Sequence, residues 1–417
     1  MTRVLLVGNG AREHAIAAAL RRSGVLVTSH MDRLNPGIAN LSEKVLLGPT
    51  TAVHPDLDTS TVDYAVIGPE APLAAGLVDE LESRHVPCVG PRKSVARIES
   101  SKSFARTLLT RVAPDANPVF HIAHDESEIR RALRDIGEDR VVVKPDGLTG
   151  GKGVRIAGEH LAGLDDELNY ASGLVKRDGL VVIEERVHGT EFTVQAFVDG
   201  DRLCTMPLVR DFKRAYDGDR GPNTGSMGSY SMEDHVLPDV NHSDIAAATG
   251  IMERAISGIR NQTGEKYRGI LYGQFMKTRS GVRLIEFNAR FGDPEAINVL
   301  SIMRSSMDEL CRSILDGDLK KAEFERLATV CVYLVPEGYP EGPIASDTPV
   351  TIETSISSEV YYASVYSRDG VTFTTSSRAI ALLGRGKTVR DAREIVYRDI
   401  NRVQGRLRYR TDIAAGL

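Results

Sequence analysis

Cysteine is scarce in this sequence. Its 417 residues include only Cys88, Cys204, Cys311 and Cys331, and none of them forms a C-x-x-C pair. This spacing gives neither the paired ligands of a zinc site nor the framework of a disulfide-rich domain. We therefore expect buried thiols in a reducing compartment.

Long apolar runs and an excess of basic residues are also missing. No apolar run reaches the roughly 18 residues of a membrane span, and the run Val4–Val7 is too short for a signal peptide before Gly8 interrupts it. Lys and Arg number 52 against 57 Asp and Glu, whereas a nucleic-acid surface requires a basic excess. We expect a cytoplasmic protein with no membrane and no nucleic-acid partner. Its length predicts two to four domains.

The first hundred residues have the pattern of a doubly wound α/β domain. A buried strand over 2–7 leads into the glycine turn 8–14 and a helix over 15–22. A second strand over 64–67 runs into Gly68-Pro69-Glu70 and a helix over 74–84, and Cys88 to Pro91 ends a third strand. Strand, glycine turn and helix in this order present backbone N–H groups to an anion.

The Gly8-x-Gly10 pair also raises the alternative of a dinucleotide site. That fingerprint is weak, because Glu13 stands where the third glycine belongs. No clean strand ending in an acidic residue follows about 20 residues further on. Arg12 fits a phosphate site better than a pyrophosphate–ribose site.

Three lysines and a glycine loop are candidates for binding phosphate. Lys102 lies in the first turn of a helix that opens near Glu99, where the helix dipole disfavours a cation unless an anion is near. The strand 141–144 ends in Lys144, and the loop after it contains Gly150, Gly151, Lys152 and Gly153. Because strand resumes at Val154 and no Gly-Lys-Ser/Thr opens a helix, this is a hairpin flap and not a P-loop. A flexible hairpin and an exposed Lys102 are the plainer alternatives.

A strand over 180–184 leads into a hinge whose extended backbone, Glu185 to Val187, offers the donor and acceptor that an adenine edge requires. Glu191 beyond it suits ribose hydroxyls as a bidentate acceptor. The polar, glycine-rich segment from Asp211 to Ser229 is too long for a simple connection and is therefore expected to be functional.

A strand pair, 270–276 and 283–287, carries the candidate metal ligands. Glu286 and Asn288 lie two residues apart and share one face, and Gln274 on the partner strand can oppose them. Carboxylate and amide oxygens suit Mg²⁺ or Mn²⁺. Arg290 continues the face. Taken alone, such a face is more often simply solvated.

Taken together, these motifs resemble the ATP-grasp ligases, in which two α+β lobes clamp ATP. The order is a lysine-capped strand, a glycine flap, a glutamate hinge and a Gln/Glu/Asn strand pair. More closely, the sequence resembles the phosphoribosylamine–glycine ligase family. The matching segments are Gly8-Asn9-Gly10-x-Arg12-Glu13-His14, Gly68-Pro69-Glu70-x-Pro72-Leu73, Gly221-Pro222-Asn223-Thr224-Gly225-x-Met227-Gly228 and Glu286-Phe287-Asn288-x-Arg290-Phe291-Gly292-Asp293-Pro294-Glu295. Leu271-Tyr272-Gly273-Gln274-Phe275 and Pro336-Glu337-Gly338-Tyr339-Pro340 are similar to the archaeal branch.

The resemblance implies three domains: a doubly wound substrate-binding domain (1–98), an ATP-grasp domain (99–321, small lobe about 118–190) and a β-rich C-terminal domain (322–417). We identify no chemistry confined to the last. The implied reaction joins glycine to 5-phosphoribosylamine through glycyl phosphate, with ATP and Mg²⁺ or Mn²⁺, in a monomer or weak dimer.

The resemblance also implies a role for each site residue. Nucleotide contacts would come from Lys102, Lys144, Gly150, Gly151, Lys152, Gly153, Glu184, Glu185, Val187 and Glu191, and metal ligands from Gln274, Glu286 and Asn288. Catalytic groups would be Asp211, Lys213, Arg290 and Asp293, with the Asp211 loop and Asp293 positioning glycine. Substrate contacts would come from Gly8, Asn9, Gly10, Arg12, Gly68, Pro69, Glu70, Asn223, Thr224, Gly225 and Met227.

The sequence departs from the family pattern at four positions: Ala11, Phe212, Ser226 and Ala414. Phe212, where the family usually has histidine, and Ser226, where it has glycine, lie on the long substrate loop. Three alternatives stay open: an ATP-grasp carboxylate–amine ligase with other substrates, a nicotinamide-dependent dehydrogenase, and a non-catalytic nucleotide-binding regulator.

Overall fold

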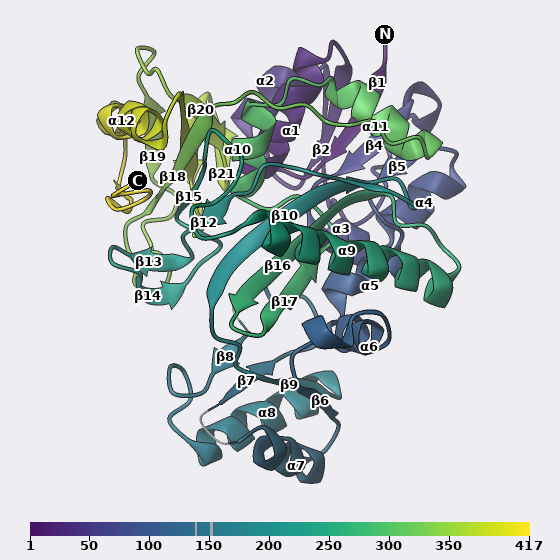
Figure 1. The fold of residues 1–417 in the computed structure, drawn as a ribbon. Coiled ribbons are helices and arrows are strands. Elements are labelled where there is room, and N and C mark those ends of the chain that lie inside the picture. The colour runs from purple at the N-terminus through teal and green to yellow at the C-terminus, as the bar shows by residue number, and fades with distance from the viewer. Residues whose placement is uncertain (138–139, 151–152) are drawn as a thin grey trace.

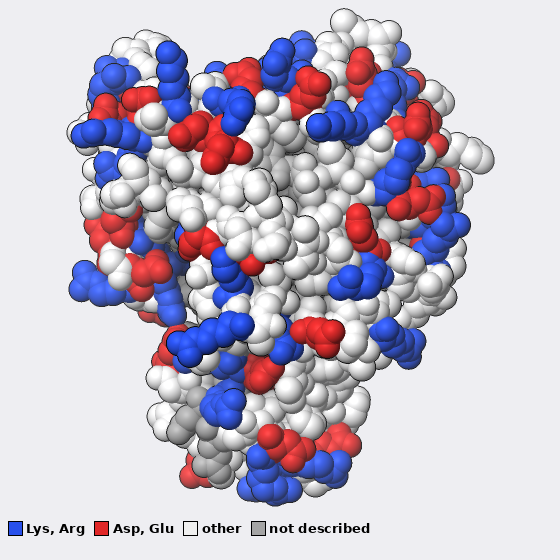
Figure 2. All heavy atoms as spheres, in the orientation of Figure 1, with Lys and Arg blue, Asp and Glu red and all other residues white. Residues whose placement is uncertain are grey.

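The computed structural model describes residues 1–137, 140–150 and 153–417 (Figure 1). No helix in this part of the chain is long and apolar enough to cross a bilayer. On the face drawn in Figure 2, acidic and basic side chains are interspersed and leave no extended field of one sign.

The N-terminal part is a parallel sheet in the order β3-β2-β1-β4-β5, which confirms the predicted doubly wound architecture. Its strands are β1 (Arg3–Val7), β2 (Leu26–Met31), β3 (Lys44–Leu47), β4 (Tyr64–Ile67) and β5 (Cys88–Val89). The helices that follow them are α1 (Ala11–Arg22), α2 (Pro36–Leu41), α3 (Glu70–Ala75), α4 (Leu77–Ser83), α5 (Lys93–Ser100) and α6 (Lys102–Val112).

Two local predictions in this part were wrong. Helix α1 begins four residues before the predicted start, because the Glu13 side chain caps the helix by accepting from Gly10 N–H at 2.7 Å. The helix predicted over 74–84 is two helices, separated at Gly76, whose φ of +97° is a left-handed conformation that favours glycine.

Strand β2 was overlooked, and Asp32 directly follows it. An acidic residue therefore does stand near the position that a dinucleotide fingerprint requires. The Asp32 carboxylate, however, accepts hydrogen bonds from the backbone N–H and the hydroxyl of Thr50, both at 2.9 Å, and so stabilises the local loop.

A small lobe projects from the body of the molecule at the bottom of Figure 1. Its sheet has the order β6-β9-β7-β8, with β6 (Phe120–Ala123), β7 (Val141–Lys144), β8 (Arg155–Ile156) and β9 (Val181–Glu185). Helices α7 (Glu126–Ile136) and α8 (Leu164–Asp178) cover one face with their own apolar cluster. Strands β7 and β8 pair antiparallel, so the predicted hairpin around the glycine loop is confirmed.

The large lobe contains the antiparallel sheet β11-β10-β16-β17. Its strands are β10 (Thr190–Val198), β11 (Leu203–Thr205), β16 (Gly269–Thr278) and β17 (Gly281–Asn288), and α9 (His242–Thr263) packs against β16 and β17. The predicted strand pair is confirmed, and Gln274 opposes Glu286 in the register. Ile285 is an extra residue on β17 between the Gln274–Glu286 and Phe275–Leu284 pairs, so the strand has a β-bulge there.

The C-terminal sheet follows the path β12-β15-β18-β23-β20, with β25 also paired to β18, and α12 packs on β18 and β23. A second sheet has the order β21-β22-β19-β24. The remaining elements are β12 (Arg210–Asp211), β13 (Arg214–Tyr216), β14 (Arg220–Asn223), β15 (Gly228–Ser231), α10 (Glu295–Ser301), α11 (Met307–Asp316), β18 (Ala328–Pro336), β19 (Pro349–Ile352), β20 (Glu359–Tyr362), β21 (Val365–Arg368), β22 (Val371–Thr374), β23 (Ile380–Gly386), α12 (Val389–Asp399), β24 (Val403–Gln404) and β25 (Leu407–Arg408), with short 3₁₀ turns at Thr59–Thr61, Pro114–Ala116 and Ile400–Arg402.

Two strands of the C-terminal sheet, β12 and β15, come from the long polar segment that precedes this region in the sequence. The substrate loop is therefore anchored at both ends in the C-terminal sheet. The domain limits at 98/99 and 321/322 remain a proposal. Strands β12 and β15 precede the second limit in the sequence, yet they belong to the same sheet as β18, which follows it.

Candidate functional site

A cleft of about 970 Å³ lies between the small lobe, the large-lobe sheet and the edge of the N-terminal domain. Most of the residues proposed from the sequence line it. They are Arg12, Glu70, Lys102, Lys144, Gly150, Glu184, Glu185, Val187, Glu191, Asp211, Lys213, Asn223, Thr224, Gly225, Gln274, Glu286, Asn288, Arg290 and Asp293. Gly151 and Lys152 lie outside the described residues. Gly153 packs against Pro145 and Thr149, and its carbonyl accepts from Tyr170.

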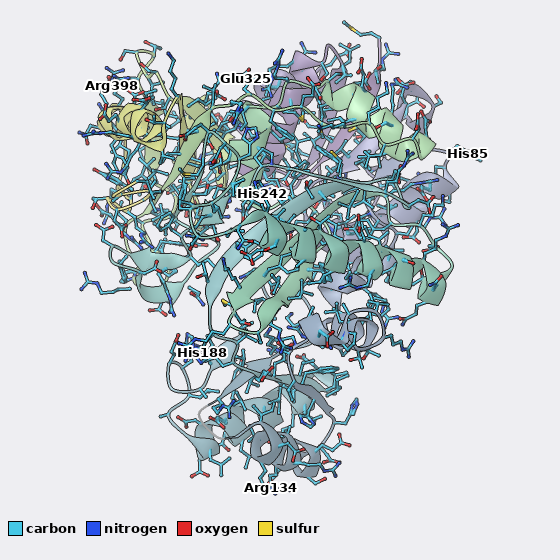
Figure 3. All side chains as sticks on the ribbon, viewed as in Figure 1. His85, Arg134, His188, His242, Glu325 and Arg398 are labelled. Carbon is cyan, nitrogen blue, oxygen red and sulfur yellow. The ribbon has the colours of Figure 1, made fainter. Side chains whose placement is uncertain are left out.

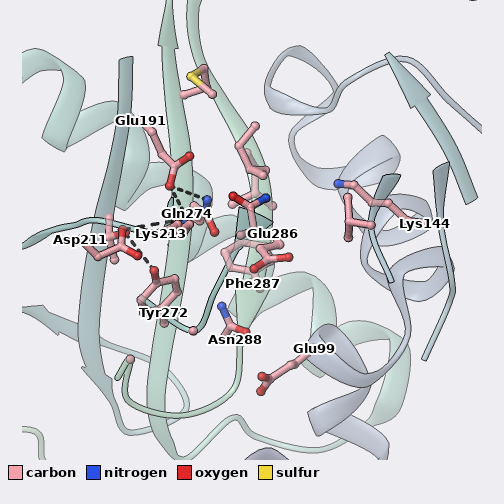
Figure 4. Close-up of a pocket in the computed structure, with 18 of the residues that line it drawn as sticks. Glu99, Lys144, Glu191, Asp211, Lys213, Tyr272, Gln274, Glu286, Phe287 and Asn288 are labelled. Carbon is pink, nitrogen blue, oxygen red and sulfur yellow. Dashed lines mark hydrogen bonds and ion pairs between the residues drawn. The ribbon is translucent and has the colours of Figure 1, made fainter. Parts of the chain in front are cut away.

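Glu286, Gln274 and Asn288 present oxygen donors to the cleft (Figure 4). The Glu286 side chain makes no hydrogen bond to any described residue. Gln274 donates its Nε2 to Glu191 at 2.7 Å, which leaves its carbonyl oxygen available, and Asn288 Oδ1 accepts from Arg290 at 3.1 Å. One carboxylate and two amide oxygens are hard ligands, and this donor set fits a divalent cation that also binds substrate phosphates.

Lys144 lies across the gap from Glu286 in Figure 4. It ends β7, and its Nζ donates to Glu184 Oε2 at 2.7 Å; both side chains are buried. Arg106 donates two hydrogen bonds of 2.7 Å to the same carboxylate. Although burial alone would raise it, these two cations hold the pKa of Glu184 at about 2. The Glu184 side chain is thus committed to Lys144 and Arg106, and its backbone is paired within the sheet between β6 and β7.

Lys102 begins α6 beside the base of the flap. Its Nζ donates to the Gly147 carbonyl at 3.0 Å, and Asp146 accepts from Ser103 N–H at 2.6 Å and from the Ser101 hydroxyl at 3.0 Å. The Asp146 carboxylate is therefore the nearby anion that offsets the unfavourable placement of Lys102 in the first turn of the helix. Burial lowers the pKa of Lys102, and the neighbouring Lys144 lowers it further.

The hinge between β9 and β10 is marked by His188 in Figure 3; Glu185 is the last residue of β9, and residues 186–189 lie outside both strands. Glu185 N–H donates to Val119 O at 2.8 Å, and the Glu185 carboxylate accepts from Val119 N–H at 3.0 Å. Val187 N–H and C=O make no hydrogen bond within the described residues. Val187 therefore keeps a free donor and a free acceptor at the cleft wall.

Glu191 is already engaged by neighbouring side chains. Lys213 and Gln274 both donate to its Oε1. Although burial would lower it, Asp211 and Glu191 hold the pKa of Lys213 well above its usual value. Binding of ribose by Glu191 would thus require its second oxygen or a rearrangement of Lys213.

Asp211 and Glu295 are buried acids on the cleft wall, and the Asp211 side chain is only 10% exposed. Burial raises the pKa of Asp211 to about 7 against the attraction of Lys213, and burial also raises the pKa of Glu295. Tyr272 donates to Glu295 at 2.9 Å. No role was predicted for Glu295, although it closes the quoted Asp293-Pro294-Glu295 motif. Buried acids of this kind favour a cationic ligand.

The raised pKa of Asp211 predicts how stability depends on pH. Between about pH 4 and pH 7 the folded protein keeps a proton that the unfolded chain releases, so the free energy of unfolding falls as pH rises through this window and levels off above it. Between pH 5.5 and 7 this contribution is about 2 kcal/mol. Chemical denaturation at several pH values should show a smaller fall in Asp211→Asn than in wild type; equal slopes would contradict the assignment.

Arg290 is held in a buried charge cluster at the edge of the N-terminal domain. Its guanidinium lies 3.0 Å from Glu99 and 3.3 Å from Glu70, and Arg12 lies 4.0 Å from Glu70. Although burial would lower it, Glu99 and Glu70 hold the pKa of Arg290 above its usual value. Arg290 also fixes the Asn288 amide, so its direct contacts include a proposed metal ligand.

The glycine turn after β1 is filled by Glu13. A Cβ at Gly8 would lie 2.7 Å from Glu13 Cγ and one at Gly68 2.5 Å, and Glu13 also binds Arg12 Nε at 2.5 Å. The Glu13 side chain fills the glycine turn that a dinucleotide site leaves open to the pyrophosphate, which argues against the dehydrogenase. Of the predicted N-terminal contacts, Arg12 and Glu70 line the cleft, whereas Gly8, Asn9, Gly10, Gly68 and Pro69 are not among its lining residues.

Three side chains of the substrate loop point away from the cleft. Met227 is fully buried in the apolar core, so the prediction that it contacts substrate is corrected to a packing role. Phe212 lies under the Arg410 guanidinium, 5.1 Å from its ring centre, and Ser226 donates to Gly228 O at 2.8 Å. Phe212 and Ser226, the two departures from the family pattern that lie on the substrate loop, therefore do not line the cleft.

Two C-terminal residues, Arg378 and Tyr333, reach Asp293. Tyr333 donates to Asp293 Oδ1, and Arg378 lies 3.3 Å from Asp293 Oδ2 and also donates to the Gly225 and Ser226 carbonyls. Arg378 lines the cleft. The sequence analysis identified no chemistry confined to the C-terminal region and did not single out Arg378, because no local sequence pattern around Arg378 reveals its partners.

Comparisons with known proteins agree over the whole chain. The N domain, the ATP-grasp (A) domain and the C domain of phosphoribosylglycinamide synthetase match residues 2–99, 100–296 and 329–416. The phosphoribosylamine–glycine ligase of Methanocella arvoryzae is 46% identical over 418 residues, covering 99% of this chain and 96% of the relative. That of Methanothermobacter thermautotrophicus is 48% identical over 420 residues, with 99% and 96% covered.

Solved structures agree as well. The crystal structure of phosphoribosylamine–glycine ligase from Thermotoga maritima superposes with a TM-score of 0.84 at 29% identity, covering 99% of this chain and 100% of that one. A biotin carboxylase from Campylobacter jejuni has a TM-score of 0.72 at 12% identity, covering 97% and 92% of the two chains, and shares the fold alone.

Proposed function

The chain belongs to the phosphoribosylglycinamide synthetase family, and on this premise we propose that it joins glycine to 5-phosphoribosylamine in an ATP-dependent reaction. It is a carbon–nitrogen ligase of purine biosynthesis, and its products are glycinamide ribonucleotide, ADP and phosphate. We place it in the cytoplasm as a monomer or weak dimer.

One observation carries the proposal: Lys144 and the Glu286–Gln274–Asn288 set face each other across a cleft whose wall also contains buried acids. The lysines would bind the ATP phosphates and the oxygen set a divalent cation, Mg²⁺ or Mn²⁺. Asp211 and Glu295 would attract the ammonium group of glycine. The cleft therefore offers lysines to the negative phosphates of the nucleotide and carboxylates to the positive ammonium group of the amino acid.

Two displacements account for the reaction. The glycine carboxylate attacks the γ-phosphate of ATP and releases ADP, and the amine of phosphoribosylamine then attacks glycyl phosphate and releases phosphate. When bound, the cation would neutralise charge that develops on the phosphates. Lys102 and Lys144 supply further positive charge, and Asp211, Lys213 and Asp293 would align the carboxylate of glycine with the phosphate.

The amine is already nucleophilic, so the proposed route needs no Ser, Cys or His nucleophile. Catalysis then depends on positioning and on electrostatic stabilisation, which are the usual requirements of phosphoryl transfer. Arg12, Glu70 and the loop 223–225 line the cleft, and we propose that they receive phosphoribosylamine.

The test measures ADP release with ATP, glycine and freshly prepared phosphoribosylamine, each omitted in turn. Release that requires both glycine and phosphoribosylamine supports the proposal. Release with another amino acid or amine, and none with these two, would favour a carboxylate–amine ligase of other specificity. Absence of nucleotide turnover with every acceptor would favour the regulator.

A further inference from the structure

Arg106 is a buried arginine between the two halves of the ATP site. It lies on α6, it is 3% exposed, and it is one of the residues that line the cleft. Sequence reasoning gave it no role. Its guanidinium nevertheless contacts the small lobe and the large lobe at once.

On one side, Arg106 holds Glu184 of β9. Its Nε and Nη2 donate to the two carboxylate oxygens at 2.7 Å each, and Glu184 in turn accepts from Lys144 at 2.7 Å. The carboxylate is a rigid link between the arginine and the phosphate-binding lysine. Bidentate arginine–carboxylate pairs fix orientation as well as distance.

On the other side, Arg106 binds the β-bulge of β17. Nη1 donates to Leu284 O at 3.1 Å, and Nη2 donates to Ile285 O at 2.7 Å. Ile285 is the extra residue of the bulge, and Glu286 follows it. Bulges re-aim the side chains beside them, so these contacts hold the backbone that directs Glu286 into the cleft.

We propose that Arg106 is a positioning residue that couples the phosphate-binding Lys144 to the metal-binding Glu286. The inference rests on the proposed function, since it assumes that the cleft receives ATP with a divalent cation. One planar guanidinium reaches both partners because its five N–H groups spread in a fixed fork. Lysine has one nitrogen and cannot occupy both positions, so Arg106→Lys keeps the charge but loses the coupling.

The experiment is calorimetric binding of a non-hydrolysable ATP analogue with and without Mg²⁺. Arg106→Lys should weaken binding at least tenfold and reduce the enhancement that Mg²⁺ gives in wild type. Glu184→Gln should also weaken binding, because it loosens Lys144, but should keep the Mg²⁺ enhancement, because the bulge contacts remain. This difference separates positioning from a general loss of structure.

Arg385→Lys is the matched control, since Arg385 also bridges a carboxylate, Glu359 at 2.8 Å, and a carbonyl, Ser301 at 3.1 Å, outside the cleft. Wild-type affinity and Mg²⁺ dependence in a folded Arg106→Lys protein, or an equal loss in Arg385→Lys, would overturn the inference. If Arg106→Lys does not fold, Glu184→Gln decides alone. Unchanged binding, or weaker binding with loss of the Mg²⁺ enhancement, overturns the inference, and weaker binding with intact Mg²⁺ enhancement supports it. Failure of the wild type to bind nucleotide would instead refute the proposed function.

Discussion

Glu286→Ala is expected to abolish ATP-dependent turnover while the fold persists. The side chain makes no hydrogen bond to a described residue, so its removal leaves no buried partner unsatisfied. Its carboxylate is also the one charged group in the proposed metal set. Loss of a single group that stabilises transition-state charge commonly lowers kcat by roughly 10²- to 10³-fold, and loss of a metal ligand should do at least as much.

Initial rates of ADP release over a Mg²⁺ titration measure this effect, with circular dichroism to confirm the fold. Glu253→Ala is the control, because Glu253 lies on an exposed face of α9 outside the cleft. A near-normal kcat at the Mg²⁺ concentration that saturates the wild type would refute the metal assignment. A normal kcat reached only at higher Mg²⁺ would reduce Glu286 to a weak ligand.

Arg290→Met is expected to lower stability as well as activity. The substitution leaves Glu99, a buried acid, without its 3.0 Å partner and removes the nearest cation from Glu70. Breaking a buried ion pair from one side costs about 3 kcal/mol or more, because the remaining charge is left uncompensated. The Asn288 amide also loses its orienting donor, so the Mg²⁺ requirement should rise.

Urea denaturation of wild type, Arg290→Met and Arg290→Lys measures the loss of stability. Arg290→Lys should fall between the other two, because it retains the charge but cannot reach Glu99, Glu70 and Asn288 together. The loss in Arg290→Met should also shrink at low pH, where Glu99 takes up a proton. A stability equal to wild type at pH 8 would contradict the buried cluster.

Those residues of the cleft whose placement depends on a single strand or loop could be predicted from the sequence. The alternation of side chains along 284–288 placed Glu286 and Asn288 on one face, and the hairpin turn at Ser280-Gly281 brought Gln274 opposite Glu286. The archaeal resemblance was equally local, and the ligases of Methanocella arvoryzae and Methanothermobacter thermautotrophicus reported above are archaeal. Short-range periodicity is sufficient for such features.

Features that depend on distant partners were not predictable. Arg106 meets Glu184 across 78 positions, and Arg378 meets Asp293 across 85. A single arginine in a sequence gives no sign of the fold that surrounds it. The first residue of helix α1 was predicted wrongly for a similar reason at shorter range. The helix start depends on how the Glu13 side chain folds back between Gly8 and Gly68.

The anchoring of the substrate loop in the C-terminal sheet has a consequence for synthesis of the chain. Strand β15 pairs with β18, which begins at Ala328, and Arg378 comes later still. The N-terminal domain and the small lobe can fold as they leave the ribosome. The loop strands β12 and β15, however, can pair only with each other until β18 has emerged, and the loop has no Arg378 contact until still later. The nucleotide half of the site therefore forms first, and a truncated chain should bind ATP without turning it over.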